Sequence, residues 1–237
     1  MLNTFKTCFI LFTLFISNSD LAAKNQEISI QFIGNCGLYM TDGDLHIYSD
    51  FPYQSGAYNY MEYDSTQLEK VHENSIFLFT HKHKDHYSGK LMRRILKEKK
   101  GKKYGSWNIS ALEKIGEDNP NFKIEAFKTK HRFTLRHYSY LITWHGKKIY
   151  LSGDTESAET IGKMKNLDWA FIPPWIVYDA KEKGIEIDSK MKAIYHLYPN
   201  QMTNNEIPSD IILLNKENYT ISISLSKNLK AKEEEES

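Results

Sequence analysis

The sequence predicts a single-domain α/β protein in which mixed sheets and helices are arranged in layers. The 237 residues lie at the upper end of the single-domain range, and a hydrophobic content of 41% is enough to bury a sizeable core. Short strand patterns are mixed with a few helical patterns along the whole chain. The chain shows no internal repeat, which argues against a solenoid or a propeller.

The first third of the chain is predicted to be rich in strands. Apolar and polar residues alternate over 27–33, which indicates a strand with one buried face. Two further strands, over 36–40 and 45–49, are joined by the turn-forming sequence Thr-Asp-Gly-Asp. The segment 75–80 contains four consecutive apolar residues, which is typical of a strand covered on both faces.

The remainder of the chain is predicted to mix helices with strands. Apolar residues at helical spacing over 91–97 indicate a helix whose basic side chains form a solvated face. A hairpin is expected from strands over 138–144 and 148–152, preceded by a strand over 122–127. The other expected elements are a helix over 156–165 capped by Thr155, a buried strand over 167–172 and an alternating strand over 219–225.

Both ends of the chain differ in composition from the middle. Residues 1–23 combine a lysine, a short apolar run and the small residues Ala22 and Ala23, which is the pattern of a cleaved signal peptide. An uncleaved anchor is the alternative, although the run is short for a bilayer span. We therefore expect a secreted or periplasmic protein without a stable membrane span after cleavage. Its mature domain would cover 24–226, followed by a charged, disordered tail over 227–237.

Charge and cysteine content narrow the function classes. Lysine and arginine total 31 against 30 acidic residues, so the chain has no broad basic field and nucleic acid is not expected as a partner. A small-molecule substrate is favoured, and the oligomeric state is left open. After cleavage Cys36 would be the only cysteine, which excludes an internal disulfide. Its neighbours Asn35 and Gly37 indicate a packed turn.

Four candidate metal ligands directly follow the apolar strand over 75–80. They are His81, His83, Asp85 and His86. Imidazole and carboxylate groups suit zinc and similar divalent ions, and ligands this close together would strain a single ion. The spacing therefore indicates two adjacent ions. A surface turn with coincidental histidines is the alternative, and Lys82 and Lys84 are compatible with either interpretation.

This run resembles the His-x-His-x-Asp-His signature of the metallo-β-lactamase superfamily, and other parts of that pattern follow in order. Asp50 resembles the strand-end aspartate that supports the metal loop, and His196 the last histidine. Asp154, in Gly-Asp-Thr at the end of a hairpin, resembles the metal-bridging aspartate. The chain looks most like the compact members related to ascorbate-phosphate lactonases and zinc phosphodiesterases. The resemblance implies a four-layer αββα sandwich with two mixed β-sheets flanked by helices.

The resemblance also implies a set of metal ligands. His81, His83 and a third histidine would bind the first ion. Asp85, His86 and His196 would bind the second, with Asp154 shared between the two ions. For Asp154 alone, the alternative is a turn residue that caps the following helix.

Both His131 and His137 lie at suitable distances before Asp154 to be the third histidine. His131 is favoured because it follows the strand over 122–127 and would lie in a polar loop, whereas His137 would start the next strand. Accordingly, His131→Ala is expected to remove metal and activity together and His137→Ala to spare both. The remaining histidines of the mature chain, assigned to surface or turn positions, are His46, His72 and His145.

These observations together predict a metal-dependent hydrolase with two zinc ions, manganese or iron being alternatives. Two cations that share a water lower its pKa toward neutrality. The metal-bridged hydroxide would cleave an ester, lactone, amide or phosphodiester bond, and Asp85 would bind metal and orient the attacking group. The chain has no Gly-x-Ser-x-Gly motif for a serine nucleophile. Two other functions stay open, a non-catalytic metal-binding module and a di-iron oxidoreductase of the same fold.

Three aromatic residues are predicted to contact the substrate, because aromatic rings commonly shape ligand pockets. They are Tyr87, Trp175 and Tyr198. For Trp175, which follows two prolines, a rigid turn with a buried indole is the alternative.

Overall fold

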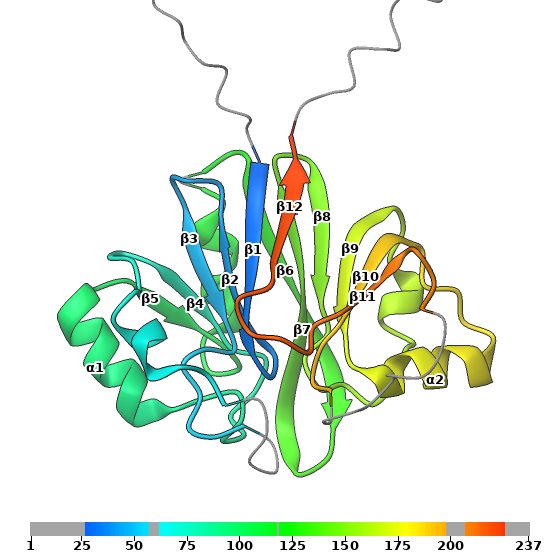
Figure 1. Cartoon of the computed structure of the whole chain (residues 1–237), viewed down its shortest axis with the longest axis horizontal. Coiled ribbons are helices and arrows are strands. Elements are labelled where there is room, and N and C mark those ends of the chain that lie inside the picture. Colours follow the sequence, from blue (N-terminus) through cyan, green and yellow to red (C-terminus); the bar gives the residue numbers. More distant parts are fainter. Residues whose placement is uncertain (1–26, 57–61, 118, 198–206, 226–237) are drawn as a thin grey trace, which may run out of the picture.

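Two six-stranded sheets face each other in the computed structural model, which describes residues 27–56, 62–117, 119–197 and 207–225 (Figure 1). The predicted signal peptide, the tail over 227–237 and Tyr198 lie outside the described residues. No helix among the described residues is long and apolar enough to cross a bilayer.

The first sheet is built mostly from the first half of the chain, in the strand order β12-β1-β2-β3-β4-β5. Strands β12, β1, β2 and β3 pair antiparallel, whereas β3, β4 and β5 run parallel. The strands are β1 (Glu27–Gly34), β2 (Gly37–Thr41), β3 (His46–Ser49), β4 (Ile76–Leu78), β5 (Lys102–Tyr104) and β12 (Thr220–Ser224).

The second sheet has the order β11-β10-β9-β8-β7-β6. Strands β6, β7 and β8 form an antiparallel meander, and β8, β9, β10 and β11 run parallel. The strands are β6 (Phe122–His131), β7 (Thr134–Trp144), β8 (Lys147–Leu151), β9 (Leu167–Ile172), β10 (Ser189–Ile194) and β11 (Ile211–Leu213).

The main hydrophobic core lies between the two sheets, and one helix covers the outer face of each (Figure 1). Helix α1 (Gly89–Lys99) buries Met92 and Ile95 against the first sheet, and α2 (Pro174–Lys183) buries Ile176 and Ala180 against the second. This arrangement confirms the predicted sandwich of two mixed sheets flanked by helices.

Local sequence signals set the ends of both helices. Ser88 caps α1 by accepting a hydrogen bond from the backbone N–H of Leu91, as serine commonly does at this position. Helix α2 begins with Pro174, whose missing N–H has no cost in the first turn, and ends at Gly184 in the left-handed conformation. Trp175 therefore lies in the first turn of a helix, not in the rigid turn considered from the sequence.

The helix predicted over 156–165 is wrong. The structure has only a short 3-10 turn at Ile161–Lys163 in this segment. Two backbone N–H groups are instead bound to other parts of the fold, because Glu156 donates to the carbonyl of Lys130 and Ala158 donates to the Asp179 carboxylate. These tertiary hydrogen bonds replace the local pattern on which the helix prediction rested.

The parallel strands place the functional loops. The carboxyl ends of β3 and β4 lie at one edge of the first sheet, and those of β8 and β10 at one edge of the second. Segments that follow these four strands, the turn between β1 and β2 and the last residue of β6 carry the polar side chains described below. Open α/β sheets commonly bind ligands at such edges.

Candidate metal centre

A buried aspartate organises the loop that carries the histidine run. Asp50 directly follows β3, and its carboxylate accepts hydrogen bonds from the backbone N–H and the hydroxyl of Thr80, both at 2.8 Å. The same carboxylate lies 2.9 Å from Nδ1 of His86. These contacts tie both ends of the loop to Asp50, whose supporting role in metal binding stays a prediction.

Three histidines form the first cluster. Ring nitrogens of His81, His83 and His131 all lie within 4.8 Å of one another. Nε2 of His131 is 3.1 Å from Nδ1 of His83, and Nε2 of His81 is buried without a hydrogen-bond partner among the described residues. Burial, followed by the neighbouring histidines, holds the pKa of His81 well below its usual value. His81 is therefore held as neutral imidazole, the form that binds metal.

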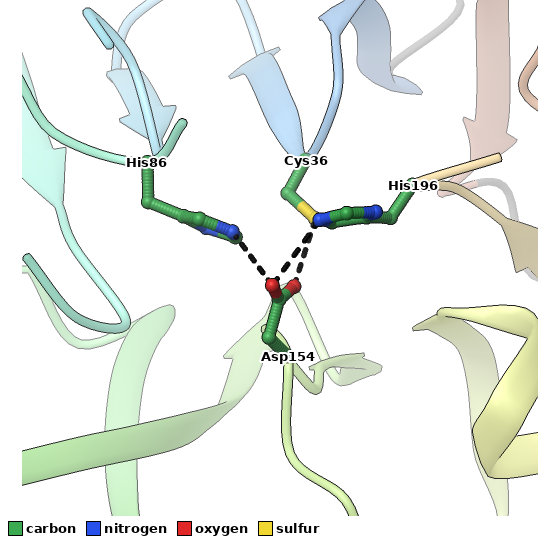
Figure 2. Close-up of side chains that lie close together, drawn as sticks. All are labelled: Cys36, His86, Asp154 and His196. Atoms are coloured by element: carbon green, nitrogen blue, oxygen red, sulfur yellow. Dashed lines mark hydrogen bonds and ion pairs between the residues drawn. The ribbon is translucent and has the colours of Figure 1, made fainter. Parts of the chain in front are cut away.

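The second cluster joins side chains from four loops around one carboxylate (Figure 2). Oδ2 of Asp154 lies 3.1 Å from Nε2 of His86 and 3.2 Å from Nε2 of His196. Sγ of Cys36 lies 3.6 Å from Oδ1 of the same carboxylate. Asp85 stands at the edge of this cluster, with Oδ2 3.3 Å from Nε2 of His196.

Opposite charges stabilise the second cluster. Burial alone would raise the pKa of Asp154, but His196 and His86 outweigh it and hold that pKa well below the usual value. Burial likewise opposes protonation of the two histidines, yet the surrounding carboxylates raise the pKa of His86 well above its usual value and that of His196 to about 9. A divalent cation would supply positive charge at the same place.

A glycine allows the tight approach of the Asp154 loop. Gly153 has a φ of 57°, and a Cβ there would come within 2.7 Å of Thr80 and 2.8 Å of Nε2 of His137. Any larger residue would therefore push the loop away from the histidine run. Tyr195 holds the same loop, because its hydroxyl accepts a hydrogen bond from the Gly153 N–H at 2.8 Å.

The two candidates for the third histidine occupy different places. Nε2 of His137 accepts a hydrogen bond from the Asp154 N–H at 3.0 Å, so the proton of the neutral ring is on Nδ1, which donates to Thr129 at 2.6 Å. Burial lowers the pKa of His137 to about 3. Both ring nitrogens of His137 thus make hydrogen bonds within the protein. His131 instead lies with His81 and His83 in the first cluster. It is the last residue of β6, not the loop residue expected from the sequence.

His131→Ala is expected to remove one ion per chain and to reduce hydrolysis by about 10²-fold or more, because the first cluster keeps only two imidazoles. Metal content per chain and kcat/KM measure this. His145→Ala is the control. His145 lies on the turn between β7 and β8, where it pairs with Asp42 from the turn between β2 and β3, and it does not line the cavity. Normal metal content in the His131 variant would contradict the assignment.

For His137, the structure adds a stability cost to the prediction that alanine spares metal and activity. The ring is fully buried and holds the backbone of Asp154, so His137→Ala leaves a cavity and an unpaired amide. A loss of about 2–4 kcal/mol of unfolding free energy is expected.

A cavity of about 830 Å³ opens over both clusters. His83, Asp85, His131, Asp154 and His196 line it, together with Trp175 and the hairpin residues Arg132 and Phe133. Its size is in the range of small-molecule pockets. The clusters thus lie at the bottom of a site that a small molecule can enter.

Of the aromatic residues predicted to contact the substrate, Trp175 lines the cavity and Tyr87 does not. Trp175 lines the cavity, donates its indole N–H to the carbonyl of Thr155 at 2.8 Å and meets the His196 ring edge to face. Tyr87 does not line the cavity, because its ring packs against Phe79 and Trp107 beneath α1. The expected substrate contact of Tyr87 is therefore not supported.

Sequence reasoning missed the position of Cys36, which was interpreted only as part of a packed turn. The thiol is fully buried, and burial, followed by the nearby carboxylates of Asp154, Asp50 and Asp85, raises its pKa well above the usual value. One signal was available. Cys36 follows a strand as closely as the histidine run does, and strand ends carry the other residues of the site.

No family model and no curated protein matches this chain. Solved structures with the same fold include the metallo-β-lactamase fold protein YhfI from Bacillus subtilis, 15% identical with a TM-score of 0.58, covering 83% of this chain and 99% of that one. A metallo hydrolase from Ignicoccus hospitalis, Igni18, is 14% identical with a TM-score of 0.56, covering 84% and 99%. The isothiocyanate hydrolase from Delia radicum gut bacteria is 13% identical with a TM-score of 0.54, covering 83% and 99%. The chain therefore has the metallo-β-lactamase fold.

Proposed function

We propose that this protein is an exported hydrolase that works with two divalent metal ions, zinc being the favoured metal. The first ion would be held by His81, His83 and His131. The second would be held by the cluster around His86 and His196, with Asp154 between the two ions and Asp85 at the edge. The amino-terminal sequence is the basis for proposing export.

One observation carries the proposal: two groups of ligand atoms, each within 4.8 Å, come together beside a single cavity. Nε2 of His81 is buried without a hydrogen-bond partner among the residues the structure describes. Buried polar atoms are rarely left in this state unless something else binds them. Imidazole and carboxylate groups match zinc and related ions, so the residues present fit the proposed metals.

When bound, the two ions would supply an activated water as the nucleophile and would polarise the group under attack. The protein's own residues do the rest. Asp50 orients His86 from behind, as carboxylates commonly do for metal-binding histidines. Asp85 is one of the carboxylates that line the cavity, where it can orient the attacking water. Trp175 packs edge to face against His196, and both side chains line the cavity.

The rim of the cavity favours a small acyl or phosphoryl compound with an apolar part. Phe133, 98% exposed at the tip of the β6–β7 hairpin, is the apolar group at the entrance. Lys84 and Arg132 supply positive charge beside it. An ester, lactone, amide or phosphodiester fits such a site, and the same-fold isothiocyanate hydrolase adds an isothiocyanate to the substrates worth testing.

Chelation is expected to reduce hydrolysis by about 10³-fold and zinc to restore it, because the ions supply several kcal/mol of transition-state stabilisation. The measurement is zinc content per chain together with hydrolysis of a panel containing phosphodiester, lactone, ester, amide, β-lactam and isothiocyanate substrates. Two zinc ions per chain are expected.

The same experiment separates the rival functions. Two bound ions with no hydrolysis of any panel member would favour a non-catalytic metal-binding module. Bound iron with redox activity would favour an oxidoreductase. Hydrolysis that survives complete metal removal would refute the proposed mechanism.

A further inference from the structure

The cysteine thiol points into the second cluster (Figure 2). Cys36 is fully buried, and its sulfur lies within 4.8 Å of the ligand atoms of His86, Asp154 and His196. Among the residues that the structure describes, the thiol makes one hydrogen bond, the 3.6 Å contact with Asp154. The sulfur therefore faces the position where the cluster would bind an ion.

A second observation points to a ligand at the same place. His86 is fully buried, and its Nε2 meets only carboxylate oxygens, at 3.1 Å for Asp154 and 3.7 Å for Asp85, without a hydrogen bond of good geometry. Nδ1 of the same ring is held by Asp50 from the other side. The ring is thus oriented with an available nitrogen directed at the centre of the cluster.

The backbone beside Cys36 is tied to two other members of the site. The carbonyl of Asn35 accepts a hydrogen bond from the His196 N–H at 3.1 Å. The Asn35 side chain donates to the carbonyl of Asp85 at 2.8 Å. These bonds fix the turn between β1 and β2 relative to both loops, so the position of the thiol is set by the site and not only by core packing.

We propose that Cys36 is a ligand of the second ion, and this inference rests on the proposed metal centre. On binding, the thiol S–H bond breaks, its proton passes to solvent, and the sulfur donates an electron pair to the metal. No oxidation or reduction takes place. In the metal-free protein the same thiol donates its proton to Asp154 instead.

A thiolate ligand has consequences for metal choice and for Asp85. Cysteine sulfur favours zinc and iron over manganese and magnesium, so the second site becomes selective for softer ions. Cys36, His86, His196 and Asp154 would give the second ion four protein ligands, and the activated water would be a further one. Asp85, which lines the cavity, then remains free to face the substrate.

Cobalt substitution of the full-length protein tests the proposal. Metal-free protein is loaded with Co²⁺, and cobalt content and the near-ultraviolet absorption spectrum are both measured. We expect two cobalt ions per chain and an intense thiolate-to-cobalt charge-transfer band. The band should persist in Cys8→Ser, the matched control at the only other cysteine, and disappear in Cys36→Ser. The affinity for the second ion should fall at least about tenfold in Cys36→Ser.

A measurement that needs no change at Cys36 keeps the test decisive if the serine variant does not fold. X-ray absorption of zinc-loaded Cys8→Ser protein should show a sulfur neighbour at about 2.3 Å. Two bound ions without sulfur coordination, or a charge-transfer band that survives in Cys36→Ser, would overturn the assignment while leaving the hydrolase proposal intact. Failure to bind any cobalt or zinc would overturn the metal centre itself, and the role of Cys36 with it.

Discussion

Asp154→Ala should lower kcat/KM by at least about 10³-fold and leave at most one metal ion per chain. This carboxylate is the common neighbour of His86, His196 and Cys36, so its loss removes the group around which the second cluster is built. A thousandfold effect corresponds to about 4 kcal/mol of transition-state stabilisation. Steady-state kinetics and metal analysis of the purified variant measure both effects.

Two further variants make the Asp154 result specific. Asp154→Asn keeps the shape of the side chain but removes its charge, and it should lose most of the activity as well. Asp210→Ala should behave as wild type, because Asp210 pairs with Lys192 outside the cavity. Two ions bound to Asp154→Ala, with activity within tenfold of wild type, would show that this carboxylate does not bind metal.

Asp50→Ala should destabilise the metal-free protein by about 3–5 kcal/mol, the usual cost of removing one partner of a buried ion pair. The Asp50 carboxylate, itself buried, accepts two hydrogen bonds from Thr80 and contacts Nδ1 of the fully buried His86. Removing it leaves a buried imidazole and two donors without their partner. Urea unfolding of chelated protein gives the free energy directly.

A smaller change in the same network provides the comparison. Thr80→Val removes only the hydroxyl that donates to Asp50, and it should cost about 1 kcal/mol. An Asp50→Ala variant no less stable than Thr80→Val would mean that the pair with His86 contributes nothing, contrary to this prediction. If the mutant retains stability but loses metal affinity, Asp50 acts only by orienting His86.

Periodicity and strand-end position predicted much of the fold. The alternating residues of β1 and β12 and the apolar run of β4 lie where one or two buried faces were expected. The helix predicted over 156–165 failed because hydrogen bonds from its first turn go to Lys130 and Asp179. Local pattern cannot register partners that are supplied by distant parts of the chain.

In the candidate site, too, local sequence patterns predicted some features and contacts between distant parts of the chain set the others. The sequence by itself determined which residues have metal-binding chemistry, because the run from His81 to His86 and the Gly-Asp-Thr motif are local. Only the tertiary structure placed His131, and not His137, in the cluster with His81 and His83. It also placed Tyr87 outside the cavity and brought Cys36 to Asp154. These outcomes depend on the direction in which a side chain leaves its strand or loop, and packing between the two sheets sets that direction.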